Sequence, residues 1–219
     1  MKTSAETILV LVMLLNLFLL GSGRLRTIIH TVAMQGIILS LLPIAFYGTL
    51  GFRELLVSIG ALVLKGVVIP RMLMRALADL PIRREVEPVI GFKMSLLLGA
   101  TATAGSIYLA TRLPLAAIGG GDGGGGASMT VATSFATVFT GFLLLTTRIK
   151  ALTQVLGYLV LENGIYVFGV LLLEATTFLV EVGVLLDLFV AIFVMGIMVN
   201  HISREFTSIS TDRLSTLRD

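Results

Sequence analysis

The sequence predicts an all-α, polytopic membrane protein of about seven transmembrane helices, with a parallel repeat of a three-helix unit. Of the 219 residues, 56% are hydrophobic and 13% are charged, and the mean hydropathy is +1.02. A soluble domain of this length needs far more polar surface to cover its core, so we expect lipid around most of the chain. Helices are the expected form of each span, because lipid cannot pair free backbone groups and no alternating barrel pattern is present.

Apolar runs that are long enough to cross about 30 Å of hydrocarbon define the expected spans. The spans are 6–22, 27–50, 53–76, 91–115, 128–147, 151–173 and 177–202. The first run resembles a signal peptide, but Glu6 stands where a basic segment is expected, and Arg24 and Arg26 follow the run directly. We therefore expect this run to be retained as a span.

The spans group into two membrane regions joined by a tether. Residues 1–118 form an N-terminal four-helix region, 119–127 a Gly-rich tether, and 128–219 a three-helix region with a cytoplasmic tail. The tether contains the run GGGDGGGG, which we interpret as a flexible spacer. A glycine run cradles phosphate where it leads from a strand into a helix, and no strand is expected here.

Basic residues gather on one predicted side of the membrane. The loops and helix ends on that side hold Arg24, Arg26, Arg71, Arg75, Arg83, Arg84, Lys93, Arg148, Lys150, Arg204, Arg213 and Arg218. The opposite side holds only Lys2, Arg53 and Arg112. Cytoplasmic loops carry the excess of Lys and Arg, so the N-terminus is predicted to lie outside and the C-terminus in the cytoplasm.

The chain also contains an internal sequence repeat. Span one, the doublet Arg24-Leu25-Arg26 and spans two and three resemble span five, the doublet Arg148-Ile149-Lys150 and spans six and seven. Four spans separate the matching helices, so both triplets run the same way through the membrane. This pattern predicts a parallel repeat.

Three ionisable residues lie near the centres of their spans: Lys65, Glu162 and Asp187. At 1.5 Å per residue each is about 15 Å from either surface, where a charge costs about 3 kcal/mol on insertion scales. We therefore expect these side chains to face protein or water rather than lipid. Burial disfavours the charged form of each, so they are candidates for a proton pathway that works near neutral pH.

Neutral polar residues accompany these groups. Asn163 is next to Glu162 and Tyr166 is one turn later, so both are candidates for relay support. Gln35 in span two and Asn16 in span one could extend such a line, although single polar residues are commonly helix contacts. Two interpretations stay open, a proton pathway or a structural Lys–carboxylate pair that locks helices together. Whether Lys65 meets Glu162 or Asp187 is also open, because the sequence does not give helix adjacency.

Several kinds of site are not expected in this chain. It has no cysteine, which excludes Cys-ligated iron–sulfur clusters and thiolate zinc sites, and His30 and His201 both lie near predicted helix ends. We expect no catalytic residue, metal ligand or cofactor-binding residue. No polar cluster of substrate size is present, which argues against a sugar or amino-acid transporter.

The C-terminal segments resemble a known family. LTQVLGYLVLENGIYVFGVLLL in span six, FLVEVGVLLDLFVAIFVMGIMV in span seven and the tail STDRLSTLRD are similar to hydrogenase-4 component E, as is LVLKGVVIP around Lys65. The resemblance covers nearly the whole chain. More loosely, residues 128–219 resemble the K subunit of bacterial complex I and the C subunit of multisubunit cation/proton antiporters. Glu162 and Asp187 match the two membrane carboxylates that support proton translocation in that family, although the second is usually Glu.

The resemblance implies a membrane-arm subunit of a hydrogenase-4 or formate-hydrogenlyase-type respiratory complex, which is not catalytic alone and contributes Lys65, Glu162 and Asp187 to proton translocation. It places the nickel–iron centre and iron–sulfur clusters in partner subunits, with none in this chain. The implied partners are antiporter-like and other membrane subunits, a soluble hydrogenase arm and the lipid bilayer of a bacterial or archaeal cytoplasmic membrane, and no nucleic acid. A subunit of a cation/proton antiporter and a purely structural scaffold are the alternatives.

Overall fold

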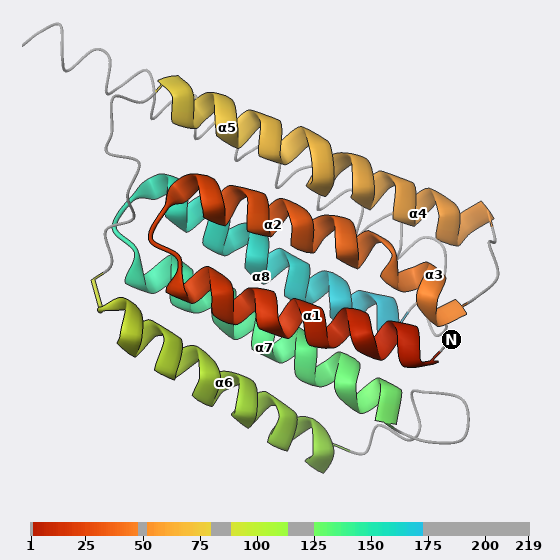
Figure 1. The fold of residues 1–219 in the computed structure, drawn as a ribbon. Coiled ribbons are helices and arrows are strands. Elements are labelled where there is room, and N and C mark those ends of the chain that lie inside the picture. Colours follow the sequence, from red (N-terminus) through yellow and green to blue (C-terminus); the bar gives the residue numbers. More distant parts are fainter. Residues whose placement is uncertain (1, 48–51, 80–88, 114–124, 173–219) are drawn as a thin grey trace, which may run out of the picture.

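A computed structural model describes residues 2–47, 52–79, 89–113 and 125–172, and the described elements are helices with no strand among them (Figure 1). The first five are α1 (Lys2–Gly21), α2 (Leu25–Ser40), α3 (Leu42–Tyr47), α4 (Phe52–Val63) and the π-helical turn η1 (Leu64–Val68). They are followed by α5 (Ile69–Asp79), α6 (Phe92–Arg112), α7 (Gly125–Thr147) and α8 (Ala151–Leu172). The expected seventh span and Asp187 lie outside the described residues.

The observed helices follow the predicted spans closely. α2 and α3 together cover the expected second span, and α4, η1 and α5 cover the third. By length and hydropathy, three described helices could cross a membrane: Leu25–Ala45, Phe92–Arg112 and Gly126–Thr147, with a shorter apolar helix at Ala5–Gly21. The all-helical, membrane-type fold is therefore confirmed for the described residues, whereas the count of seven spans and the repeat stay predictions.

Two prolines lie where longer helical segments are interrupted. Pro43 lies in the first turn of α3, where a missing N–H is tolerated. The helix is interrupted at Leu41, two residues before this proline. Pro70 lies in the first turn of α5, directly after η1, in which the N–H of Ile69 bonds to the carbonyl of Leu64. A proline cannot donate to the preceding turn, so the wider π turn forms where an ordinary helical bond is missing.

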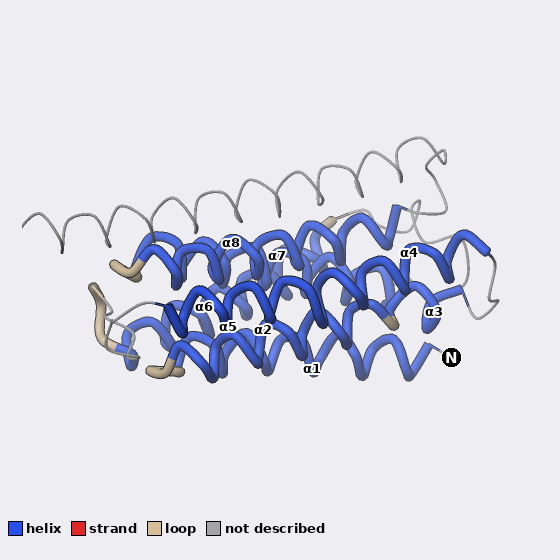
Figure 2. The backbone as a smooth tube through the Cα atoms, turned by 90° about the horizontal axis from the view of Figure 1, so that it is seen from above, coloured by secondary structure: helices blue, strands red, loops and turns tan. Residues whose placement is uncertain are grey.

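The long helices lie side by side and stay nearly parallel to one axis (Figure 2). α7 and α8 pack most closely: a Cβ at Gly157 would lie 2.8 Å from the backbone nitrogen of Leu145, and one at Gly164 would lie 2.7 Å from that of Val138. The Ser134 hydroxyl also donates to the Gly164 carbonyl at 2.8 Å. Small residues and a side-chain hydrogen bond are typical contacts between membrane helices, which have no hydrophobic force to drive them together.

Helices from the two halves of the chain are neighbours in the bundle. α1 and α7 run in the same direction, as do α2 and α8 (Figure 1). Asn16 on α1 donates to Thr137 on α7 at 2.8 Å, and the buried Arg148 after α7 donates to the carbonyl of Leu20 at 2.9 Å. Arg148 thereby supplies a donor to a carbonyl at the C-terminal end of α1, where a cation is favoured. This end of the bundle is fixed by a contact between distant parts of the sequence.

Candidate functional site

Lys65 lies halfway along the rod formed by α4, η1 and α5, within the π turn. The residue is only 6% exposed although it carries an ammonium group. Single π turns inside helices are frequent at functional sites, because they change the direction in which a side chain points. Here the turn accompanies a lysine that is directed into the bundle.

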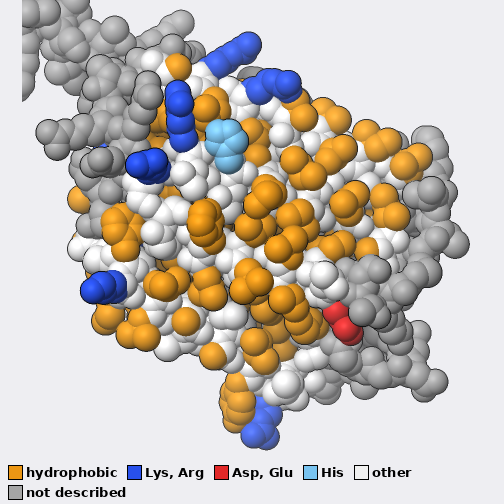
Figure 3. Space-filling model, viewed as in Figure 1, with side chains coloured by type: hydrophobic (Ala, Val, Ile, Leu, Met, Phe, Trp, Pro, Cys, Tyr) orange, Lys and Arg blue, Asp and Glu red, His pale blue; other side chains and the backbone are white. Residues whose placement is uncertain are grey.

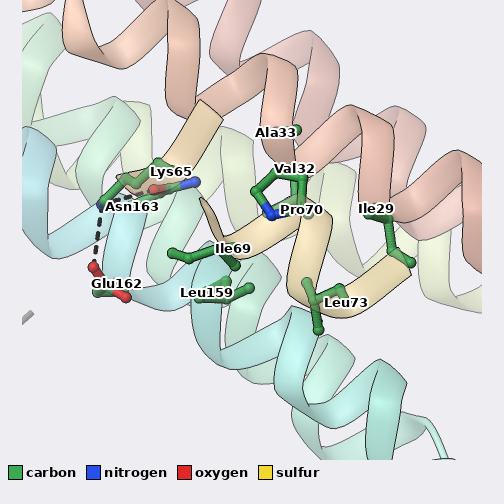
Figure 4. A pocket seen from close by; sticks show the side chains of 10 residues that line it. All are labelled: Ile29, Val32, Ala33, Lys65, Ile69, Pro70, Leu73, Leu159, Glu162 and Asn163. Carbon is green, nitrogen blue, oxygen red and sulfur yellow. Dashed lines mark hydrogen bonds and ion pairs between the residues drawn. The ribbon is translucent and has the colours of Figure 1, made fainter. Parts of the chain in front are cut away.

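The Lys65 ammonium meets Glu162 of α8 in the interior (Figure 4). The Lys65 Nζ lies 3.3 Å from Glu162 Oε1, and the two side chains are 5% and 14% exposed. The same Nζ donates a hydrogen bond to Asn163 Oδ1 at 2.9 Å and lies 4.8 Å from the centre of the Tyr166 ring. Lys65 is thus held by a carboxylate, an amide and an aromatic face, three groups that each favour a cation.

The Glu162 carboxylate can accept more hydrogen bonds than its contact with Lys65 uses. Among the described residues, neither buried Glu162 oxygen accepts a hydrogen bond beyond the ion pair with Lys65, and the buried Tyr166 hydroxyl has no partner. A cavity of about 10 Å³ borders Lys65, Glu162 and Asn163. A buried water requires roughly 10–15 Å³ and several polar neighbours, so this site is close to the size of one water molecule.

A chain of side-chain hydrogen bonds leads from Lys65 across the bundle. Each amide accepts from the Lys65 side through its oxygen and donates onward through its nitrogen, so every carbonyl dipole is oriented to favour the ammonium. The bonds are Asn163 Nδ2 to Gln35 Oε1 at 3.3 Å, Gln35 Nε2 to Asn16 Oδ1 at 2.8 Å, and Asn16 Nδ2 to Thr137 Oγ1 at 2.8 Å. The chain connects α8, α2, α1 and α7.

Gly36 allows α2 to approach this site. A Cβ at Gly36 would lie 2.6 Å from the Cβ of Lys65, closer than two such carbons can pack. The absent side chain therefore lets the backbone of α2 lie directly against η1, one residue away from Gln35. Glycine here provides room for close approach rather than an unusual backbone conformation.

The structure brings together six residues that the sequence singled out: Lys65, Glu162, Asn163, Gln35, Asn16 and Tyr166. It pairs Lys65 with Glu162, a choice that the sequence left open, while Asp187 lies outside the described residues. Sequence reasoning missed Thr137 and Gly36. Several threonines line α7, so nothing in the pattern distinguishes Thr137. The glycine that directly follows Gln35 in an apolar span was a sign of close helix packing, but it did not show which helix lies against it.

The polar groups of the site, as far as the structure describes it, are of few kinds. Within the part of the chain that the structure describes, no three His, Cys, Asp or Glu side chains gather as a metal site would require. The described polar groups are one cation, one carboxylate, amides and hydroxyls. Such a set can hold a proton, orient a water molecule and lock helices together.

Comparisons with known proteins find full-length relatives. The chain is 32% identical over 203 residues to the uncharacterized protein Rv0085 of Mycobacterium tuberculosis, covering 89% of this chain and 87% of that protein. It is 24% identical over 215 residues to hydrogenase-4 component E of Escherichia coli and of Shigella flexneri, covering 95% of this chain and 94% of those proteins. No protein-family model matches the chain, and no solved structure matches it.

Proposed function

Since the chain belongs to the same family as the uncharacterized protein Rv0085 of Mycobacterium tuberculosis, we propose that it is a membrane subunit of a hydrogenase-type complex that takes part in proton translocation. The hydrogenase part of the proposal rests on the full-length similarity to hydrogenase-4 component E. The proton part rests on one observation, the contact of 3.3 Å between Lys65 and Glu162 inside the bundle.

The Lys65–Glu162 pair has two states of equal net charge. In one, the ammonium faces the carboxylate. In the other, a proton has moved from Lys65 Nζ to a Glu162 oxygen, which leaves a neutral amine and a neutral carboxylic acid. Loss of hydration disfavours the charged state, and attraction across the short distance favours it. Because these large terms oppose each other, a nearby change of charge can move the proton from one group to the other.

The amides hold the pair and do not carry the proton. An amide neither gains nor loses a proton readily near neutral pH, so Asn163 and Gln35 cannot pass one on by changing protonation state. Their carbonyl oxygens instead stabilise the ammonium and fix the position of Lys65 Nζ. Onward transfer is assigned to the free acceptors of Glu162 and to a water in the cavity beside it.

In the proposed cycle, a redox reaction in partner subunits changes a charge near the pair. The proton then moves to Glu162, leaves through its unpaired oxygen, and Lys65 is protonated again from the other side. The nickel–iron centre and iron–sulfur clusters belong to those partner subunits. Asp187 is the proposed further carboxylate of the pathway.

Replacing Glu162 by glutamine tests this proposal. Glu162→Gln keeps the shape and one carbonyl oxygen near Lys65 but cannot accept the proton. We expect the complex to assemble while proton uptake by inverted membrane vesicles is lost. Glu6→Gln, a change at an exposed carboxylate on α1, is the matched control and is expected to leave proton uptake intact. Poor assembly of Glu162→Gln with no specific transport defect would instead support a scaffold that uses the charges for packing.

The identity of the complex requires a separate measurement. Purification of the chain in mild detergent, followed by mass spectrometry of the proteins that accompany it, is expected to recover a nickel–iron hydrogenase large subunit and antiporter-like membrane subunits. Recovery of antiporter subunits with sodium-dependent proton flux and no hydrogenase subunit would contradict the hydrogenase assignment.

A further inference from the structure

A second hollow lies at the basic end of the bundle, between α2 and the η1–α5 part of the rod. It has a volume of about 530 Å³, within the roughly 300–1,000 Å³ of small-molecule sites. Basic side chains gather around the histidine at this end of the face, and the rest of the face is largely hydrophobic (Figure 3). The hollow is lined by His30, Arg71, Arg75 and six residues without charge.

The charge of the hollow is positive. Arg71 and Arg75 are one helical turn apart on α5, so both guanidinium groups border the same space. Among the described residues neither arginine forms an ion pair, and no acidic residue lines the hollow. The ring of His30 is held at the rim by its Nδ1, which donates to the Arg26 carbonyl at 2.7 Å. Planar guanidinium groups that are free of carboxylates are the usual partners of phosphate.

The remaining wall is apolar. Ile29, Val67, Pro70 and Met74 line the hollow between the charged groups, and Val67 is 39% exposed. A small inorganic anion would leave these residues uncovered. A ligand with an anionic head and a hydrocarbon tail would meet both the arginines and the apolar wall.

The position of the hollow agrees with a lipid ligand. It lies at the end of the bundle that holds Arg24, Arg26, Lys93, Arg148 and Lys150, which the distribution of charge predicts to face the cytoplasm. Basic pockets between transmembrane helices on that side are suited to acidic lipid headgroups. It also shares Ile29 and Pro70 with the small cavity beside Lys65, so an occupant would lie next to the wall of the buried site.

We propose that this hollow binds one anionic phospholipid, with the phosphate between Arg71 and Arg75 and the acyl chains along Val67, Pro70 and Met74. The inference does not require proton translocation and stands apart from the proposed function. It assigns to these two arginines a specific binding role rather than general attraction to the membrane surface.

Native mass spectrometry of the full chain in detergent tests the inference. Phosphatidylglycerol and phosphatidylcholine are added at equal concentration, and the apparent affinity ratio is measured. The unmodified chain is expected to retain one phosphatidylglycerol in preference to phosphatidylcholine. In the double variant Arg71→Gln/Arg75→Gln this preference is expected to fall by about tenfold or more, because the charge-assisted hydrogen bonds of both guanidinium groups to the phosphate are lost.

A matched pair of arginines separates a site from general surface charge. Arg24 and Arg26 are exposed at the same end of the bundle and do not line the hollow. Arg24→Gln/Arg26→Gln removes the same charge and is expected to change the preference by less than about twofold, because exposed arginines outside the hollow act on the lipid only through charge that solvent and salt screen. An equal loss in both pairs would overturn the inference.

Further measurements cover a double variant that does not fold and other occupants of the hollow. If the double variant does not fold, each single variant is expected to lose the preference by several-fold. Inorganic phosphate is expected not to displace the lipid, and displacement would show that the hollow is a site for free anions. If the double variant lost a protein that accompanies the unmodified chain while its lipid retention stayed unchanged, an acidic segment of that partner would be the occupant of the hollow. This result would also overturn the inference.

Discussion

The side-chain amide of Asn163 connects the buried ion pair to Gln35. Its oxygen accepts from Lys65 at 2.9 Å, and its nitrogen donates to Gln35 at 3.3 Å. Asn163 lies on the C-terminal helix of the described part, whereas Lys65 and Gln35 belong to the N-terminal half. The charge of Lys65 is therefore linked by aligned dipoles to helices that are far apart in the sequence.

Removal of Lys65 alone is expected to be costly. Lys65→Met would leave the Glu162 carboxylate buried without its cation, and loss of one partner of a buried pair costs about 3–5 kcal/mol. Lys65→Met/Glu162→Leu removes both charges and is expected to recover most of that loss. The measurement is the free energy of unfolding in mixed micelles of dodecyl maltoside and SDS.

Lys93→Met is the control for the loss of a lysine, since Lys93 is exposed on α6 and such changes stay within about 0.5 kcal/mol. Additive effects of Lys65→Met and Glu162→Leu would show that the two side chains do not interact in the folded chain.

The bond between Asn16 and Thr137 is expected to hold α1 against α7. Asn16→Ala removes the donor to Thr137 and also leaves Gln35 Nε2 without its acceptor. Side-chain hydrogen bonds between membrane helices are worth about 0.6 kcal/mol and at most about 1.7 kcal/mol, so Asn16→Ala should cost about 1–2 kcal/mol. Thr137→Val in the Asn16→Ala background should then cost less than it does alone.

Thr146→Val is the control for this double-mutant cycle of Asn16 and Thr137. The Thr146 hydroxyl is exposed and bonds only to carbonyls of its own helix among the described residues. Its loss should be independent of Asn16, and a coupling as large as that of Thr137 would contradict the proposed contact.

Gly36 is expected to tolerate no side chain. Gly36→Ala would place a carbon 2.6 Å from the Lys65 Cβ and force α2 away from η1. Overpacking of this kind costs about 1–3 kcal/mol, and it should also reduce proton uptake because Gln35 moves with α2. Gly60→Ala on α4 is the control, since a Cβ there meets nothing within 4 Å. Equal stability of the two variants would show that α2 and η1 are less close than described.

The helices could be predicted because apolar length is a local property. The expected spans 91–115 and 151–173 correspond to α6 at Phe92–Arg112 and α8 at Ala151–Leu172. The break before Pro43 also has a local cause, the missing proline N–H, although 27–50 was expected to be one uninterrupted span. These features need no knowledge of which helices touch.

The pairing of Lys65 with Glu162 could not be predicted in the same way. A single charged residue in each helix reveals that a partner or water is needed, but not which helix supplies it. The close approach at Gly36 depends on packing between α2 and the neighbouring rod, whereas the π turn at Leu64–Val68 directly precedes Pro70. The candidate residues were thus identifiable from the sequence, and their contacts required the arrangement of the bundle.

The orientation of the chain can be tested with single cysteines, because the sequence contains none of its own. Glu6 is exposed near the start of α1, and Ile149 is 62% exposed between Arg148 and Lys150 at the other end of the bundle. The excess of basic residues at that second end predicts that it faces the cytoplasm. Glu6→Cys should therefore react with a membrane-impermeant maleimide in intact spheroplasts, and Ile149→Cys only after permeabilisation.

The unmodified chain gives no labelling background, so a weak signal can be assigned to the introduced thiol. Labelling of Ile149→Cys in intact spheroplasts, with Glu6→Cys protected, would reverse the orientation. The hollow lined by Arg71 and Arg75 would then face the outer leaflet, and the side from which a proton reaches Lys65 would be exchanged. Labelling of both sites in intact spheroplasts would mean that Glu6 and Ile149 are on the same side, which a bundle with α1 and α7 crossing the whole membrane does not permit.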